Sequence, residues 1–127
     1  MTTRHWPTEL RVPKDRAALL VRYGDGTTHR LSAEYLRVFT PSAERLGHGG
    51  TRTLIGGKQG VLIDQLSQVG RYAVRIGFDD GHHTGIYPLT SLWPLHEEFE
   101  ASWAQYLAEL AGQGLSRTVA GEARMPR

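Results

Sequence analysis

Apolar and polar residues alternate along several stretches before residue 88, which is the pattern of β-strands that are buried on one face. The clearest stretch begins at Tyr72, and Tyr72, Val74, Ile76 and Phe78 fall on the same side of it. Its β-branched and aromatic residues favour a strand over a helix. The same pattern predicts five further strands, over residues 9–12, 17–23, 27–31, 61–69 (with a bulge) and 84–87.

Two turns rich in aspartate and glycine join consecutive strands, Gly24-Asp25-Gly26 and Asp79-Asp80-Gly81. Glycine adopts positive φ at little steric cost, so both triplets predict tight hairpin turns. Each turn is followed by a return strand and then by a helical pattern, so residues 23–36 and 78–92 echo each other. Chance similarity between two common hairpins is the simpler interpretation of this echo, and a repeated unit is the alternative.

Two helices are predicted, one after each hairpin. The first is short, because Ser32 suits the N-cap position and Pro41 prevents continuation. Residues 41–60, which include six glycines, are predicted to form a long loop. The second helix is longer and ends at Gly112 and Gly114. Its predicted apolar stripe consists of Phe99, Trp103, Leu107 and Leu110. The aromatic residues predicted to fill the core between helix and sheet are Trp6, Trp93, Phe99, Trp103 and Tyr106.

These elements predict an α+β fold: a small antiparallel sheet of hairpins, a short helix after the first hairpin and a longer C-terminal amphipathic helix. The chain has 127 residues, of which 39% are hydrophobic and 22% charged. Such a composition excludes a disordered chain, a fibrous repeat and an integral membrane protein. We expect a single domain over residues 1–111 and a flexible basic tail over residues 112–127.

The charge balance argues against a nucleic-acid partner. Lys and Arg total 15 against 13 Asp and Glu, and the excess lies in residues 112–127, so residues 1–111 are neutral overall. Binding to a phosphate backbone would need cations clustered on one face. The absence of cysteine excludes disulfides, thiol nucleophiles and cysteine-held zinc or iron–sulfur clusters, and it suits a cytoplasmic protein. No apolar run approaches the roughly 20 residues that cross a bilayer, so no membrane partner is expected.

The densest group of chemically competent side chains is the turn Asp79-Asp80-Gly81-His82-His83. Carboxylate and neutral imidazole are ligands of zinc, iron and nickel. A candidate metal site therefore combines one histidine and one carboxylate of this turn with the distant His48 or His29. The alternative is a solvent-exposed turn whose aspartates accept hydrogen bonds from the local backbone. No nucleophile accompanies the histidines and no catalytic motif is present, so no enzyme is expected.

Several segments of the chain together resemble the DUF971 family, also called the gamma-butyrobetaine hydroxylase-like N-terminal domain. The resemblance extends over roughly residues 7–96. The segments that carry it include Leu31-Ser32-Ala33-Glu34-Tyr35-Leu36, Pro41-Ser42-Ala43-Glu44, Gly47-His48-Gly49, Gly57-Lys58 and Phe78-Asp79-Asp80-Gly81-His82. The resemblance implies a small α+β domain, in agreement with the predicted elements.

In gamma-butyrobetaine hydroxylase this domain carries a zinc site of three cysteines and a histidine. The resemblance places the cysteine positions at about Thr40, Ser42 and Arg45 of this chain and the histidine position at His82. Hydroxyl oxygen and guanidinium do not replace thiolate, so we do not expect the zinc site to be retained, and no cofactor is expected beyond weak zinc or iron binding. Similar domains are fused to Mrp-type P-loop ATPases that handle iron–sulfur clusters, which implies an accessory role in metal-cofactor or iron–sulfur protein assembly.

We therefore expect a non-enzymatic, cytoplasmic binding or adaptor module with an unknown protein partner. Its expected partner surface joins the glycine-rich loop to the second turn and consists of Ser42, Glu44, His48, Asp79, Asp80 and His82. The alternative hypothesis is a metal-binding protein that uses His48, His82 or His83 together with Asp79 or Asp80.

Overall fold

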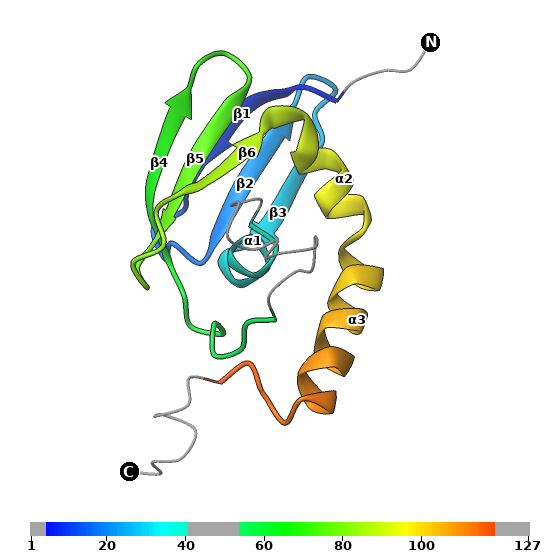
Figure 1. Cartoon of the computed structure of the whole chain (residues 1–127). Coiled ribbons are helices and arrows are strands. Elements are labelled where there is room, and N and C mark those ends of the chain that lie inside the picture. The colour runs from blue at the N-terminus through cyan, green and yellow to red at the C-terminus, as the bar shows by residue number, and fades with distance from the viewer. Residues whose placement is uncertain (1–4, 41–53, 119–127) are drawn as a thin grey trace.

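The computed structural model describes residues 5–40 and 54–118 of the chain, and it has the α+β fold predicted from the sequence (Figure 1). The strands belong to two antiparallel sheets of three strands each, rather than to a single sheet. The first sheet consists of β1 (Pro7–Arg11), β2 (Ala18–Tyr23) and β3 (Thr28–Ser32). The second consists of β4 (Ile63–Val69), β5 (Ala73–Phe78) and β6 (Gly85–Pro88). The helices are α1 (Ala33–Val38), the 3-10 turn η3 (Leu89–Ser91), α2 (Leu92–Glu97) and α3 (Phe99–Gly112).

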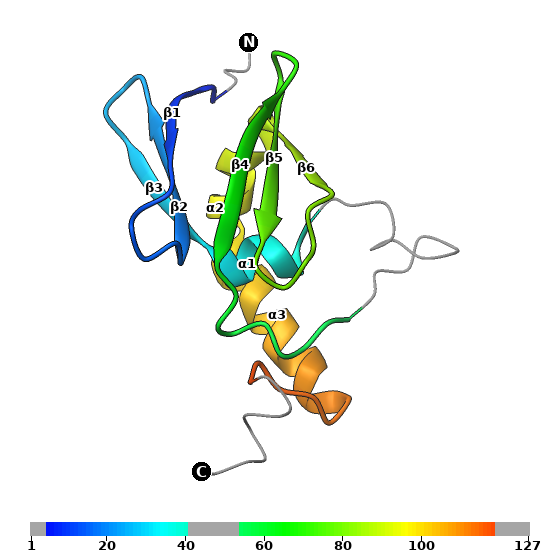
Figure 2. The same cartoon turned by 90° about the vertical axis from the view of Figure 1, so that its left-hand side faces the viewer.

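The two sheets repeat one arrangement of three strands, a tight turn and a helix (Figure 2). The first strand of each sheet, β1 and β4, contains a register shift. The shift in β4 confirms the bulge predicted there. In the hairpin turns Gly26 and Gly81 have φ of 93° and 94°. Asp25 Oδ1 accepts the N–H of Thr27 at 2.9 Å, and Asp80 Oδ1 accepts the matching N–H two residues on at 3.0 Å. The echo in the sequence therefore extends to hydrogen bonding.

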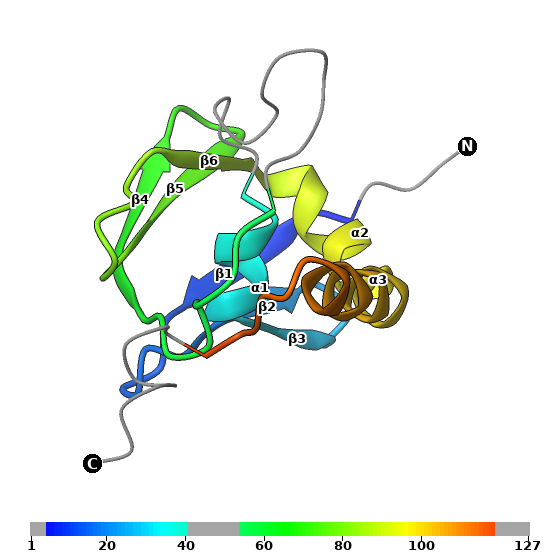
Figure 3. The same ribbon diagram turned by 60° about the horizontal axis from the view of Figure 1, so that its bottom comes forward.

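Helix α1 lies between the two sheets and is the centre of the core (Figure 3). Ser32 caps it as predicted, because its Oγ accepts the N–H of Tyr35 at 3.0 Å. Five of its six residues are buried, whereas a surface helix buries one stripe only. The largest fully buried side chains around it come from both sheets and from the C-terminal helices, and they include Leu19, Leu31, Ile63, Ile76, Phe78, Tyr87 and Tyr106.

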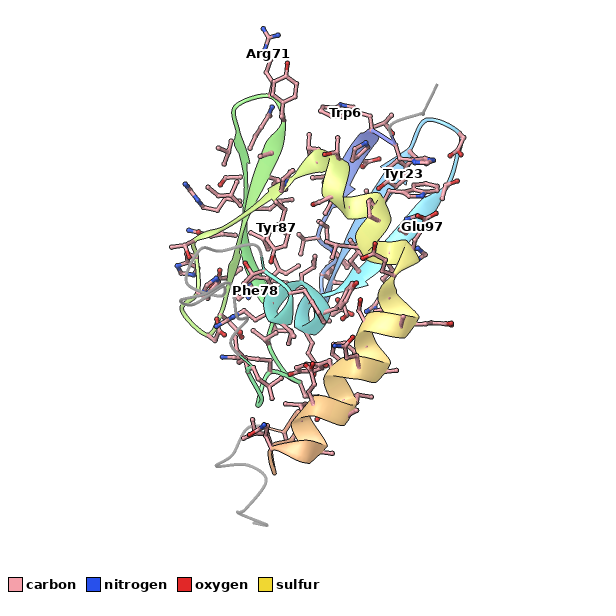
Figure 4. All side chains as sticks on the ribbon, turned by 45° about the vertical axis from the view of Figure 1, so that its right-hand side comes forward. Trp6, Tyr23, Arg71, Phe78, Tyr87 and Glu97 are labelled. Atoms are coloured by element: carbon pink, nitrogen blue, oxygen red, sulfur yellow. The ribbon has the colours of Figure 1, made fainter. Side chains whose placement is uncertain are left out.

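Three buried tyrosine hydroxyls bind main-chain carbonyls and hold the helices in place. Tyr87 donates to the carbonyl of Leu36 in α1 at 2.5 Å, and Figure 4 shows its side chain pointing from β6 toward that helix. Tyr35 donates to Leu95 in α2 at 2.6 Å, and Tyr106 of α3 donates to Ile55. Because a buried hydroxyl without a partner is costly, each tyrosine specifies where its neighbouring element docks.

The buried face of α3 differs from the predicted stripe at one position. Tyr106 and Leu110 are fully buried, whereas Leu107 is 40% exposed. At about 100° per residue, Tyr106 falls about 20° from the direction of Phe99 and Leu107 falls about 80° away, so the tyrosine continues the stripe. Trp93 and Trp103 pack against the core as predicted, but Trp6 is exposed. It meets Tyr72 edge-on at 5.9 Å in the turn after β4, so neither side chain joins the core.

Part of the segment expected as a tail, residues 112–127, packs against the domain. The N–H groups of Gly57 and Gln59 donate to the carbonyls of Ser116 and Arg117, both at 2.9 Å. Arg117 also forms a bidentate ion pair with buried Glu34 at the start of α1, at 2.7 and 2.8 Å. Hydrogen bonding to Glu34 raises the pKa of this guanidinium. None of the helices in the described part of the chain combines the length and the apolar character of a membrane span.

Candidate functional site

The two aspartates of the predicted site form hydrogen bonds that connect the second turn to other segments of the fold. Asp79 is bonded in both directions to Leu62, the residue before β4: its N–H donates to the Leu62 carbonyl and its Oδ1 accepts the Leu62 N–H, both at 2.9 Å. Asp80 Oδ2 accepts Arg37 Nε of α1 at 2.7 Å and Lys58 Nζ at 2.6 Å. The turn after β5 thus joins α1 and the segment that leads into β4.

The environment of Asp80 keeps its carboxylate ionised. Burial by itself would raise the pKa of Asp80, but hydrogen bonds from Lys58, from the His82 N–H and from Arg37 outweigh it and lower the pKa to about 2. The carboxylate accepts three donors and faces two cations. This arrangement agrees with the alternative in which the aspartates serve the structure of the turn.

The two histidines of the turn have different neighbours. The His82 ring is partly buried and lies 6.5 Å from Phe78. His83 is more exposed and lies over Gly77, and its Nε2 is 3.3 Å from Asp64 Oδ1. The imidazoles therefore contact different parts of the domain, as expected for adjacent residues of an extended segment.

The remaining residues of the predicted site, Ser42, Glu44 and His48, lie outside the described residues. The proximity of His48 to the second turn, which the expected partner surface requires, therefore stays a prediction. Within residues 5–40 and 54–118, no three histidine, aspartate or glutamate side chains are grouped so that they would hold a metal ion.

The positions that correspond to the zinc ligands of gamma-butyrobetaine hydroxylase do not suit zinc in this chain. Thr40 is buried, and its hydroxyl lies against Gly85, three positions after His82. The donor set of Thr40, Ser42, Arg45 and His82 contains no thiolate and one imidazole. These residues do not fit a structural zinc ion.

A groove that the sequence did not predict runs between β1 and β4, one outer strand of each sheet. In Figure 2 β1 and β4 are the neighbouring strands of the two sheets. In the described part of the chain each of these strands pairs with one neighbour only, as β3 and β6 also do, and α2 packs beside β3. The groove consists of two hollows of about 380 and 350 Å³, and Leu66 borders both. The residues that border the first are Pro7, Thr8, Glu9, Leu10, Leu66, Gln68, Ala73, Val74 and Leu89. Those that border the second are Val12, Pro13, Lys14, Arg16, Ile63, Asp64, Gln65 and Leu66.

The two ends of the groove differ in charge. At the first hollow Glu9 is paired with Arg22 at 3.2 Å. The second hollow has two exposed cations, Lys14 and Arg16, and its carboxylate, Asp64, faces His83. We call this second hollow the basic end of the groove. No periodicity in the sequence predicts the groove, because its walls belong to strands that are not neighbours in any sheet.

A second polar cluster, between the first sheet and α2, was also not predicted from the sequence. His5 stacks on Trp93 at 3.6 Å, and His29 stacks on His96 at the same distance, with Tyr23 edge-on to Trp93. In the described part of the chain Tyr23 Oη, His29 Nδ1 and Trp93 Nε1 are buried without a hydrogen-bond partner. Burial raises the pKa of Tyr23 to about 12, and burial followed by the charge of His96 lowers the pKa of His29. The cluster attaches α2 to the first sheet.

Comparisons with known proteins point to one family. Two solved structures, both determined by NMR in solution, are 39% and 38% identical to this chain, with TM-scores of 0.77 and 0.76. Their alignments cover 91% and 92% of this chain and 91% and 90% of those chains. A crystal structure of a protein of unknown function from Acidithiobacillus ferrooxidans, a member of the DUF971 family, is 34% identical with a TM-score of 0.61, over 76% of this chain and 98% of that one.

No curated protein matches the chain. The family model described as gamma-butyrobetaine hydroxylase-like, N-terminal, matches residues 10–93, which include the end of β1, the other five strands, α1 and the start of α2. This span and the likeness to the DUF971 crystal structure confirm the resemblance seen in the sequence. The chain belongs to the gamma-butyrobetaine hydroxylase-like N-terminal (DUF971) family.

Proposed function

We propose that this protein is a non-enzymatic, cytoplasmic adaptor domain that binds a protein partner in the groove between β1 and β4. The observation that carries the proposal is the pair of open strand edges on either side of one groove. The outer edge of a strand presents main-chain N–H and C=O groups, and an extended segment of another protein can pair with them. Leu10 and Leu66 supply an apolar surface for the partner's side chains.

The groove suits a partner better than the aspartate turn does. Arg37, Lys58 and the His82 N–H already donate to the Asp80 carboxylate, so few acceptor positions are left on it for a partner. The outer edges of β1 and β4 pair with no strand in the described part of the chain, although the Ile63 N–H at the start of β4 already donates to the Arg16 carbonyl. The resemblance to domains fused to ATPases of iron–sulfur metabolism supports a partner from metal-cofactor assembly, and this remains the hypothesis for the partner's class.

The absence of native cysteine permits a specific test. Gln68, exposed on β4 at the first hollow, is changed to cysteine and alkylated with a bulky maleimide, which fills the groove. The control is Arg75→Cys, alkylated in the same way, because Arg75 is exposed on β5 and does not border the groove. Affinity capture from native cytoplasmic lysate, quantified by mass spectrometry, is compared among the wild type and the two conjugates. His48→Ala and His82→Ala are measured in parallel.

We expect a reproducible partner that is lost with the Gln68→Cys conjugate and retained by the control. A partner lost with the histidine variants but retained by the Gln68→Cys conjugate would move the surface to the second turn and refute the groove. If no reproducible partner is captured by the wild type, the adaptor role itself is wrong.

A further inference from the structure

We infer that the groove binds an extended peptide segment that carries an acidic side chain, and that Arg16 and Lys14 bind this acidic group at the basic end. The inference rests on the proposed function and adds the chemical class of the partner. It is carried by the backbone of Arg16, by the distribution of charge along the groove and by the form of its two walls.

Arg16 occupies a backbone conformation that favours glycine. Its φ of 59° is the only positive φ of a non-glycine residue in the described ranges. The turn needs only its main chain, because its N–H donates to the Pro13 carbonyl at 2.9 Å and its carbonyl accepts the Ile63 N–H at 2.8 Å. Glycine would make both bonds without strain. The arginine at this position borders the groove although glycine would suit the backbone better, which points to a role for the guanidinium in binding.

The charges in the groove are complementary to an acidic segment. Glu9 at the far end is neutralised by Arg22, and Asp64 at the basic end faces His83, whereas Lys14 and Arg16 have no ion-pair partner among the described residues. Arginine binds carboxylate through two parallel hydrogen bonds, so it suits the side chain of Asp or Glu. A carboxylate at the basic end is therefore the group that the groove would recognise.

The form of the two walls favours a single extended segment over pairing with a second copy. The register shifts in β1 and β4 and the proline at the start of β1 interrupt the edges, which disfavours edge-to-edge pairing of whole sheets. A short segment can pair with the regular part of either edge, with alternate side chains directed to Leu10 and Leu66.

The probe for the test is a phage-displayed library of random nine-residue peptides, panned on the full chain. We expect the enriched peptides to have Asp or Glu at one fixed position. Arg16→Gly removes the cation and keeps the turn, so it is expected to weaken binding of an enriched peptide about tenfold at low salt, with a smaller difference at high salt. The matched control is Arg30→Ala, an exposed cation of β3 outside the groove, which is expected to leave affinity unchanged.

Two further measurements identify the mode of binding and the occupant. Hydrogen exchange should show that the bound peptide protects amides of β1 and β4 and leaves the edges of β3 and β6 unchanged. Size measurement across the same concentrations is expected to give a monomer. A groove-dependent dimer would assign the occupant to a second copy, and binding that appears only after removal of residues 119–127 would assign it to this chain's own C-terminus; either result would overturn the inference.

The outcomes separate this inference from the proposed function. One contrary outcome is that the enriched peptides fail to bind the Gln68→Cys conjugate but have no fixed acidic position. Another is that they bind Arg16→Gly as well as they bind the wild type. Either outcome would overturn the acidic recognition and leave the adaptor role standing. No enrichment at all, together with no captured partner, would refute both.

Discussion

The ion pair between Arg117 and Glu34 provides a sharp test of how the C-terminal segment contributes to stability. The carboxylate of Glu34 is 7% exposed and accepts Arg117 Nε at 2.8 Å and Nη2 at 2.7 Å. The same guanidinium lies 5.5 Å from the centre of the Trp103 ring, so it also contacts α3. Arg117→Ala removes both interactions and leaves a buried carboxylate without its partner.

The magnitude follows from the exposure of the two partners. Removing one member of a fully buried pair costs about 3–5 kcal/mol. Arg117 is 37% exposed, so water can partly replace the guanidinium and the expected loss is about 2–3 kcal/mol. For a domain of this size such a loss lowers Tm by about 10 °C.

Urea and thermal unfolding, followed by circular dichroism, measure the effect. Glu34→Gln is expected to cost less than Arg117→Ala, because the arginine that it leaves behind can be hydrated whereas the buried carboxylate cannot. The double variant Glu34→Gln/Arg117→Ala should be more stable than Arg117→Ala alone, which would show the coupling directly. Arg75→Ala, an exposed control, should change stability by less than about 0.5 kcal/mol. A loss below about 0.5 kcal/mol for Arg117→Ala, or additive costs in the cycle, would refute the reasoning.

Three further outcomes are expected from unfolding measurements on single variants. Arg16→Gly relieves a positive φ and should stabilise the domain by about 0.5–1 kcal/mol, whereas Arg16→Ala, which keeps a Cβ, should give no such gain; equal effects would contradict the strain. Because burial and then His96 lower the pKa of His29, the unfolded chain binds a proton below pH of about 6.5 that the folded domain does not. The contribution of neutral His29 to the free energy of unfolding should be fully present above that pH and should be lost as the pH falls toward the folded-state pKa, by at most about 1.4 kcal/mol per pH unit. His29→Phe should remove this part of the dependence of stability on pH, and an unchanged dependence would count against this explanation. Gly85→Ala should cost about 2 kcal/mol because its Cβ would collide with the Thr40 hydroxyl, while Gly60→Ala, with nothing within 4 Å, should be close to neutral; similar costs for both would refute the steric explanation.

Local signals in the sequence predicted much of the secondary structure for identifiable reasons. The alternation of Val74, Ile76 and Phe78 corresponds to three buried positions of β5. Ser32 caps α1, and both glycine turns have the positive φ that their residue types favour. These features depend on residues that are close in sequence, so periodicity and turn chemistry are sufficient to find them.

Other features depend on residues that are far apart in sequence. Glu34 lies in the first turn of α1, where an acidic residue needs no distant partner, yet it is buried against a residue 83 positions away. The aspartates of the second turn looked available for a metal or a partner, yet Arg37 and Lys58, which are remote in sequence, bind one of them. In the same way the cluster of His5, His29 and His96 has no spacing signature, because the three histidines come from distant parts of the chain: one precedes β1, one is in β3 and one is in α2.

The sequence by itself determined the elements of this protein: its strands, its two glycine turns, its capped short helix and its membership of a family through a specific set of motifs. These properties arise from backbone sterics and from periodic burial, which act over a few residues. Only the tertiary structure decided that the hairpins form two sheets around α1, that the aspartates brace the fold, and that two open edges border a groove. Those outcomes depend on which apolar faces are buried together and on which distant charges meet, and no local pattern records that choice.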